Sequence, residues 1–183
     1  MDIHATPLTG VYRVIATPYQ DERGQFARWF CQRELADLLD GQQIVQINHS
    51  LTRCAGAVRG LHFQYPPHAE MKLIRCLRGR VFDVAVDLRA GSPTLWHWYG
   101  VELSAATHMM LVIPKGCAHG FQVLEPDSEL LYLHTTFYAP AAEGGIHIDD
   151  SRLKITWPLP ITDLSPRDQA LPRLTTDFTG IPL

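Results

Sequence analysis

A chain of 183 residues can bury one sizeable core, and its 46% hydrophobic and 19% charged residues are typical of a globular protein rather than a disordered one. The formal charge of -3 and the pI near 6.3 provide no general attraction to nucleic acid or to acidic membranes, which argues against both kinds of partner. Because no basic region precedes an apolar stretch at the N-terminus, and no apolar window could cross a bilayer, we expect a cytoplasmic protein with a single domain over 1–183.

Most of the chain is predicted to form short strands. One helical pattern covers 33–40, where Leu35, Leu38 and Leu39 share a face. Strand-like runs bounded by turn residues cover 12–17, 43–50, 72–77, 80–88, 96–103, 109–113 and 130–136. The sequence Arg78-Gly79-Arg80 predicts a hairpin between two of these runs. This spacing favours an all-β sandwich or barrel.

The segment after Pro158 loses clear periodicity and is rich in Pro, Asp and Thr. We therefore expect a core over 53–158 and a C-terminal arm over 159–183 that lies on the barrel. No internal repeat is visible.

Polar side chains alternate along one predicted strand. Asp83, Asp87 and Arg89 share a face of the segment 81–89, with Val81 and Ala85 between them. Such a face can line a polar cavity or can simply be exposed to solvent, and the pattern does not choose between the two.

The four cysteines do not suggest a metal or redox site. Cys31, Cys54, Cys76 and Cys117 are scattered, without the close pairs of a zinc ribbon or a redox motif. We expect four reduced thiols.

The segment 114–121 resembles the second conserved motif of cupins, with a proline, a glycine and then a histidine. In metal-binding cupins the first motif supplies a glutamate ligand, and here the matching position is Lys72. A lysine ammonium only donates hydrogen bonds and cannot replace an anionic ligand. We therefore expect no metal and no cofactor, although His62, His68 and His119 keep a metal-dependent cupin as an alternative.

Several motifs in their order along the chain carry a closer resemblance. They are Asp21-Glu22-Arg23-Gly24, Asn48-His49-Ser50, Arg59-Gly60-Leu61-His62-Phe63-Gln64, Lys72-Leu73-Ile74-Arg75-Cys76, Ala118-His119-Gly120-Phe121, Tyr138-Ala139-Pro140 and Ser165-Pro166-Arg167-Asp168. With them the chain resembles the dTDP-4-dehydrorhamnose 3,5-epimerases, metal-free cupins with a double-stranded β-helix, or jelly roll, and a few short peripheral helices. The resemblance implies epimerisation at C3, C5 or both of a nucleoside-diphosphate 4-keto-6-deoxyhexose.

The resemblance also implies a proton-transfer mechanism. Epimerisation next to a ketone needs a base on one face of the sugar, an acid on the other and a cation or donor at the enolate oxygen. His62 is the implied base, oriented by Asp168, while Tyr132 is the acid and Lys72 stabilises the enolate. Without the resemblance, Tyr132 would be interpreted as a core aromatic and Asp168 as a surface turn residue.

Further residues match substrate-binding positions of the family. They are Arg23, Phe26, Arg28, Gln46, Asn48, Arg59, His119 and Tyr138, with Asp83 orienting the cluster. The resemblance further implies a homodimer that exchanges N-terminal strands within 1–52, so that Arg23 reaches the pocket of the neighbouring subunit.

Two positions depart from the family pattern. Arg28 stands where the family usually has an acidic residue, and because arginine only donates hydrogen bonds, the base of the nucleotide is open between thymidine and cytidine. His147 stands where a tryptophan is common. A CDP-linked substrate and a non-catalytic sugar-nucleotide-binding cupin therefore remain alternatives.

Overall fold

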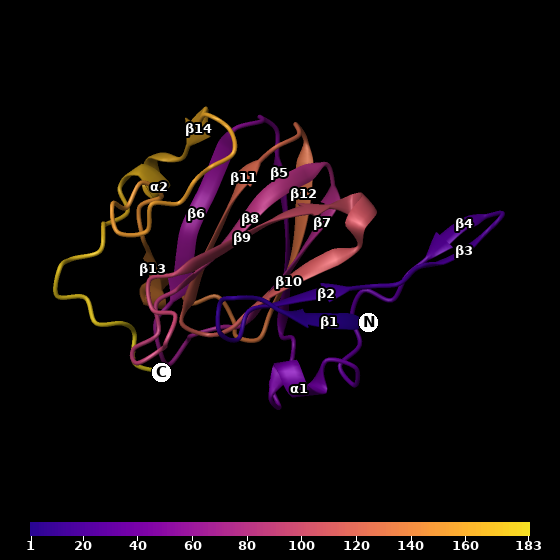
Figure 1. The fold of residues 1–183 in the computed structure, drawn as a ribbon, viewed down its shortest axis with the longest axis horizontal. Helices are drawn as coiled ribbons and strands as arrows, with labels where there is room; N and C mark the ends of the chain where they lie inside the picture. The colour runs from indigo at the N-terminus through magenta and orange to yellow at the C-terminus, as the bar shows by residue number, and fades with distance from the viewer.

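The computed structural model describes residues 1–183, and its centre is a pair of β-sheets that face one another (Figure 1). Neighbouring strands of the first sheet are antiparallel, and their order is β1 (Asp2–Ala5), β2 (Tyr12–Ile15), β10 (Met109–Ile113), β7 (Lys72–Arg78), β12 (Ser128–His134) and β5 (Gln46–Thr52). The second sheet has the order β13 (Glu143–Gly145), β6 (Ala57–Gln64), β11 (Cys117–Val123), β8 (Arg80–Asp87) and β9 (Trp98–Ser104), with β14 (Asp163–Leu164) parallel to β6.

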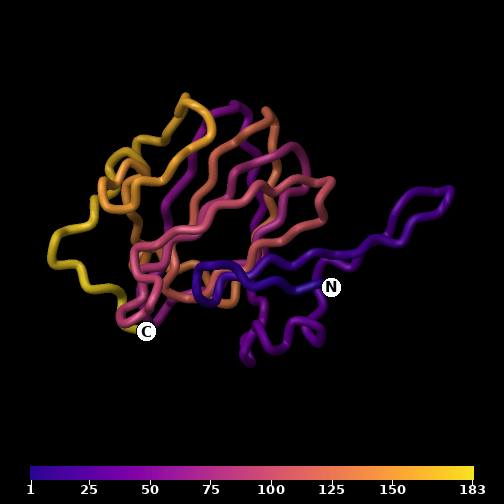
Figure 2. The backbone as a smooth tube through the Cα atoms, in the orientation of Figure 1, coloured from indigo at the N-terminus to yellow at the C-terminus, as the bar shows by residue number.

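A small hairpin and short helical turns complete the molecule. Strands β3 (Tyr19–Asp21) and β4 (Gly24–Phe26) pair only with each other, and their hairpin projects well away from the sheets (Figures 1 and 2). The helices are α1 (Ala36–Leu39) and α2 (Pro166–Gln169), with 3-10 turns η1 (Ala105–Thr107) and η2 (Pro140–Ala142). No helix is long and apolar enough to span a membrane.

Alternation along the strands divides the apolar residues into three clusters. Ile74, Phe121 and Leu130 belong to the cluster between the sheets, because every second side chain of a strand points to the same face. The outer face of the first sheet is covered by Leu35 and Leu39 of the α1 region. Part of this outer face is thus covered by a segment that lies outside the sheets.

The C-terminal segment covers the outer face of the second sheet. Leu164, Leu174 and Ile181 pack with that sheet's outward residues, and the Ile181 amide donates to the Leu88 carbonyl at 2.6 Å. Figure 2 follows this segment, in yellow, around the outside of the molecule. The course of the arm determines where the residues of α2 lie.

All seven runs expected to be strands contain strands, with ends shifted by a few residues. The predicted helix over 33–40 is shorter, because turns occupy 32–35 and Asp40 adopts a left-handed conformation with φ 46°. Strands β6 and β11 were not predicted. Each has a central glycine, Gly60 or Gly120, and interior glycine is unfavourable in strands unless backbone segments must approach closely.

The predicted hairpin at Arg78-Gly79-Arg80 is wrong. Strand β7 belongs to the first sheet and β8 to the second, so the turn at Gly79 carries the chain from one sheet to the other. Gly79 has φ +72°, and a Cβ there would lie 2.4 Å from the Ser128 hydroxyl, which itself accepts from the Arg80 amide. A tight turn therefore has the same sequence signal whether it joins paired strands or crosses between sheets.

Candidate active site

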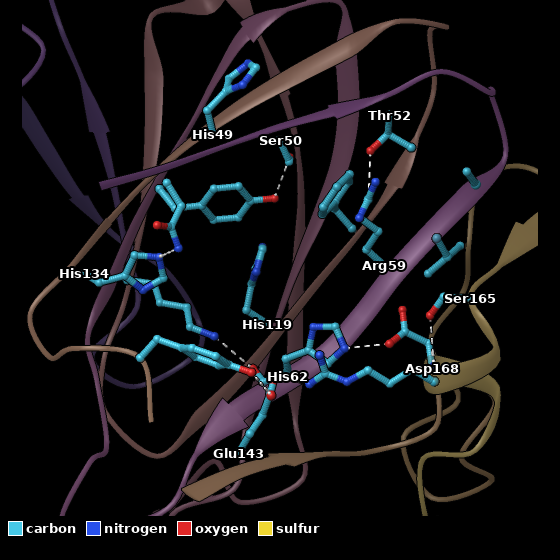
Figure 3. Close-up of a pocket in the computed structure, with 18 of the residues that line it drawn as sticks. His49, Ser50, Thr52, Arg59, His62, His119, His134, Glu143, Ser165 and Asp168 are labelled. Carbon is cyan, nitrogen blue, oxygen red and sulfur yellow. Dashed lines mark hydrogen bonds and ion pairs between the residues drawn. The ribbon is translucent and has the colours of Figure 1, made fainter. Parts of the chain in front are cut away.

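A cavity of about 580 Å³ opens between the two sheets (Figure 3). Strands of both sheets and the segment around α2 supply its walls. The lining residues are Asn48, His49, Ser50, Thr52, Ala57, Val58, Arg59, His62, Glu70, Lys72, His119, Phe121, Tyr132, His134, Tyr138, Glu143, Asp163, Ser165, Arg167 and Asp168. Polar side chains dominate this set, as a site for a charged, hydroxylated ligand requires.

A β-bulge at Gly60 brings two of these residues to the same side of β6. His62 pairs with His119 and Arg59 with Phe121, so three residue steps on β6 oppose two on β11. Without the extra residue, Arg59 and His62 would point to opposite faces of the sheet. Gly60 has φ +131°, and a Cβ on it would lie 2.6 Å from the Gly120 Cα. Glycine at both positions therefore allows the bulge.

His62 is hydrogen-bonded to a carboxylate from the C-terminal segment. Its Nε2 lies 2.7 Å from Asp168 Oδ1, and the two positions are 106 residues apart in sequence (Figure 3). A carboxylate can only accept, so the proton is on Nε2 and the lone pair of the neutral ring is on Nδ1. The side chain of His62 is 29% exposed and that of Asp168 only 5%. This geometry prepares Nδ1 to accept a proton from a ligand.

Asp168 is itself held by the helix that carries it. Ser165 caps α2 by accepting from the Asp168 amide at 3.1 Å, and the Gly60 amide donates to Asp168 Oδ2 at 3.3 Å. Burial alone would raise the pKa of Asp168, but the hydrogen bond and charge of His62 and the donor at Gly60 hold that pKa below its ordinary value. Asp168 is therefore a carboxylate at neutral pH.

Beside His62 lies a second pair of an imidazole and a carboxylate. His119 Nε2 donates to Asp83 Oδ2 at 2.9 Å, and both side chains are almost fully buried. Burial lowers the pKa of His119, although Asp83 opposes the shift. The solvent-face interpretation of the strand 80–88 is thus wrong, because Asp83 and Asp87 are both buried. Only Asp83 lies next to the cavity, since Asp87 binds Arg89 and neighbouring hydroxyls.

Tyr132 faces these residues from the first sheet. Its hydroxyl is 3.1 Å from the Ser50 hydroxyl, and its ring centroid is 6.0 Å from that of His119. Burial raises the pKa of Tyr132 well above its ordinary value, although the Ser50 contact opposes the shift. The phenol therefore keeps its proton at neutral pH and can act as a donor.

The lining cations differ in their partners. Lys72 Nζ donates to the His62 carbonyl at 3.1 Å and lies 3.3 Å from Glu70 Oε1. Arg167 pairs with Glu143. Arg59 has no acidic partner: its Nε donates to the Thr52 hydroxyl at 2.9 Å. A guanidinium with unused donors at a cavity wall is suited to an anion.

Four of the expected substrate-binding residues lie outside this cavity. Arg23, Phe26 and Arg28 belong to the projecting β3–β4 hairpin or follow it; Arg23 pairs with Asp21 there, and Arg28 pairs with Glu34 at 2.6 Å. Gln46 is not a lining residue, but its amide contacts Asn48 at 3.2 Å and accepts from the Tyr138 amide.

The other expected site residues meet at the cavity. Asn48, Arg59, His62, Lys72, His119, Tyr132, Tyr138 and Asp168 line it, and Asp83 touches one of them. Motifs that are far apart in the sequence thus contribute residues to the same cavity.

Several lining residues were not expected from the sequence. Glu70 and His134 form a buried pair at 2.7 Å, and Glu143 accepts from the Tyr138 hydroxyl at 2.7 Å. Glu70 stands two residues before Lys72, and Arg167 stands next to Asp168, so their neighbours in the sequence were the available signal. His147 lies away from this cavity, on a separate hollow at the C-terminal segment.

The residues at the cavity do not form a metal-ligand set. No group of three or more His, Cys, Asp or Glu side chains is arranged to hold a metal ion. His68, the third histidine of the metal-dependent alternative, is absent from the cavity lining, and Lys72 stands at the position of an anionic ligand. The donor arrangement therefore fits proton transfer better than metal binding.

Comparisons with known proteins identify the family that this chain resembles. A family model described as dTDP-4-dehydrorhamnose 3,5-epimerase matches residues 5–176. The dTDP-4-dehydrorhamnose 3,5-epimerase of Salmonella typhimurium is 44% identical over 159 residues, which are 85% of this chain and 86% of that protein.

Two solved structures extend the likeness to the fold. The dTDP-4-dehydrorhamnose 3,5-epimerase of Elizabethkingia anophelis superposes with a TM-score of 0.92 at 39% identity, covering 97% of this chain and 98% of the other. The dTDP-6-deoxy-D-glucose-3,5-epimerase of Legionella pneumophila, in complex with dTDP-4-keto-L-rhamnose, superposes at 0.87 and 39% identity, covering 96% and 99%. The expected all-β cupin-type jelly roll is confirmed.

Proposed function

The chain belongs to the dTDP-4-dehydrorhamnose 3,5-epimerase family, and we propose that its cavity performs the family's proton transfers with His62 as base and Tyr132 as acid. The protein is an isomerase that epimerises a dTDP-linked 4-keto-6-deoxyhexose at a carbon next to the ketone. The observation that carries the residue roles is the His62–Asp168 hydrogen bond, directed into a cavity whose opposite wall holds Tyr132.

The base step uses the free nitrogen of His62. A C–H bond next to a ketone is acidic because the resulting carbanion is delocalised onto the ketone oxygen as an enolate. Nδ1 accepts the proton, and Asp168 stabilises the imidazolium that forms. Since Asp168 also accepts from the Gly60 amide, it cannot easily rotate away from the ring.

The acid step comes from the other sheet. Tyr132 lies on β12 of the first sheet and His62 on β6 of the second, so a sugar between the sheets has one residue on each face. The buried phenol holds its proton until the carbanion on its side requires it. Delivery on the face opposite to abstraction inverts the carbon.

Two cations serve different parts of the substrate. Lys72 stabilises the charge that develops on the ketone oxygen, because an ammonium in a largely buried wall acts strongly on a nearby enolate. Arg59 binds the diphosphate, since it is the lining cation without an acidic partner. Buried His119 uses its Nε2–H for Asp83, so its Nδ1 can accept a hydrogen bond from a sugar hydroxyl.

We propose further that the protein is a homodimer in the cytoplasm, and the projecting hairpin supports the dimer. Both strands of β3–β4 are exposed along their length, with Tyr19 79% and Phe26 71% exposed. An exposed hairpin that carries Arg23 and Phe26 can insert into the pocket of a second copy, where an arginine and an aromatic ring suit a nucleotide. Arg28, paired with Glu34, then leaves base recognition to other contacts.

The test is proton exchange in deuterium oxide. The protein is incubated with dTDP-linked and, separately, CDP-linked 4-keto-6-deoxyglucose, and the protons at C3 and C5 are followed by NMR. Loss of either signal with the dTDP substrate identifies the carbon that is deprotonated. His62→Asn should abolish exchange and keep dTDP binding within about threefold, because the ring contributes the base rather than the nucleotide contacts. Exchange in that variant would reject His62, and no exchange in the natural protein would favour a binding protein.

A further inference from the structure

A third buried carboxylate–imidazole pair, Glu70 with His134, lies on the wall opposite Asp168. Glu70 lies two residues before Lys72, the first residue of β7, and His134 ends β12, where it faces Lys72 in register. Glu70 Oε2 is 2.7 Å from His134 Nδ1, and Glu70 Oε1 is 3.3 Å from Lys72 Nζ. The three side chains are between 8% and 10% exposed. The Glu70 carboxylate thus contacts two cavity residues, His134 and Lys72, and has no proton-transfer role of its own.

The Glu70 side chain is ionised at neutral pH. Burial would raise the pKa of Glu70, but the His134 hydrogen bond and the Lys72 charge hold it below its ordinary value. A buried carboxylate is costly unless its oxygens are paired, and here each oxygen has its own partner. Removing either partner would leave part of that anion unpaired.

Lys72 is held by two acceptors at fixed positions. Its ammonium has three N–H donors; it donates to the His62 carbonyl and forms an ion pair with Glu70. The His62 carbonyl does not use all three donors, so the ammonium can also donate to a ligand oxygen. The four-carbon side chain of lysine is flexible, so without Glu70 the ammonium of Lys72 would be held less firmly in this orientation.

His134 connects the pair to the rest of the wall. Nδ1 donates to Glu70, while Nε2 is 3.3 Å from the Asn48 amide nitrogen and can accept from it. The ring also lies nearly parallel to that of Tyr132, at an interplanar angle of 20° and a centroid distance of 6.2 Å. The orientation of Glu70 is therefore coupled to the residues beside Tyr132.

We propose that Glu70, supported by His134, is a positioning residue that directs the Lys72 ammonium at the enolate oxygen. The inference rests on the proposed role of Lys72 as enolate stabiliser. Glu70 acts only through Lys72: the charge that Lys72 meets develops during the reaction, so the contribution of Glu70 belongs to the transition state rather than to substrate binding.

The test begins with Glu70→Gln, which keeps the size of the side chain but removes its charge and one acceptor oxygen. The turnover number for exchange with dTDP-4-keto-6-deoxyglucose should fall about tenfold or more, while KM and the Kd for dTDP stay within about twofold. The matched control is Glu102→Gln, which removes a surface carboxylate paired with Arg80. Its turnover should stay within about twofold of the natural protein.

Two variants of His134 separate positioning from a general loss of packing. His134→Asn keeps a side-chain donor for Glu70 and should hold turnover within about threefold, whereas His134→Phe keeps the ring but cannot donate and should lose about tenfold. In Glu70→Gln combined with His134→Phe, the loss should be smaller than the product of the two single losses, because both act through Lys72.

The outcomes distinguish this inference from the proposed function. If the natural protein exchanges no proton, the proposed function fails before Glu70 is tested. If the natural protein exchanges and Glu70→Gln retains its turnover, or raises KM alone, Glu70 does not position Lys72. Should Glu70→Gln fail to fold, equal turnover in the two His134 variants would still overturn the proposal.

Discussion

Replacing Asp168 with asparagine tests whether one carboxylate sets the tautomer of His62. Asp168 accepts two hydrogen bonds, from His62 Nε2 at 2.7 Å and from the Gly60 amide at 3.3 Å. Asparagine has nearly the same shape but only one acceptor oxygen. If that oxygen faces Gly60, the amide NH2 faces His62, and the imidazole proton moves to Nδ1. The nitrogen proposed as the base is then blocked.

The magnitude follows from these contacts. A hydrogen bond to a charged group contributes about 1 kcal/mol more than a neutral one, which is close to a tenfold effect on the rate. Occupation of the unproductive tautomer adds about another factor of ten. We expect turnover to fall about 10²-fold in Asp168→Asn, with the Kd for dTDP within about twofold, because the nucleotide contacts proposed above do not include Asp168.

Exchange of the C3 and C5 protons by NMR measures the rate, and the ¹⁵N shifts of the His62 ring report the tautomer. Asp177→Asn makes the same chemical change at an exposed position of the C-terminal segment and should leave the rate unchanged within about twofold. A rate in Asp168→Asn within about threefold of the natural protein, or an unchanged His62 tautomer with a 10²-fold loss, would refute the reasoning.

Three further substitutions have distinct expected results. Tyr132→Phe should lower the yield of epimer about 10²-fold while deuterium still enters on the His62 side, as NMR of recovered substrate would show; equal losses of both would contradict separate roles. Arg59→Lys should raise the Kd for dTDP about tenfold by calorimetry, with turnover at saturation within about threefold, because lysine lacks the planar fork of donors. For Asp87, burial would raise the pKa, but its bonds to Arg89 and to neighbouring hydroxyls lower it from 3.8 to about 2. A pKa that is lower in the folded protein than in the unfolded chain stabilises the fold at pH values above the unfolded pKa, and this stability is lost as the pH falls through the folded pKa. Asp87→Asn should therefore lower the free energy of unfolding in urea by about 2 kcal/mol near pH 7 and by markedly less near pH 2.

Local features and the family can be predicted from the order of residues alone. Alternation and turn residues located seven of the strands, because strand periodicity and tight turns depend on neighbouring residues. Lys72, at a ligand position of metal-binding cupins, argued against a metal site, and the family resemblance implied proton transfer. The motifs around His62, His119 and Asp168 predicted a site whose members do meet at one cavity.

The tertiary structure alone decided how distant segments combine. The turn at Gly79 crosses between sheets, and the bulge at Gly60 turns Arg59 and His62 to one side; both depend on pairing with strands far along the chain. The pairing of Glu70 with His134, 64 residues away, carries no local signal. Hydrogen bonds of this kind form only after the two sheets have packed face to face, so their partners are set by the fold and not by sequence spacing.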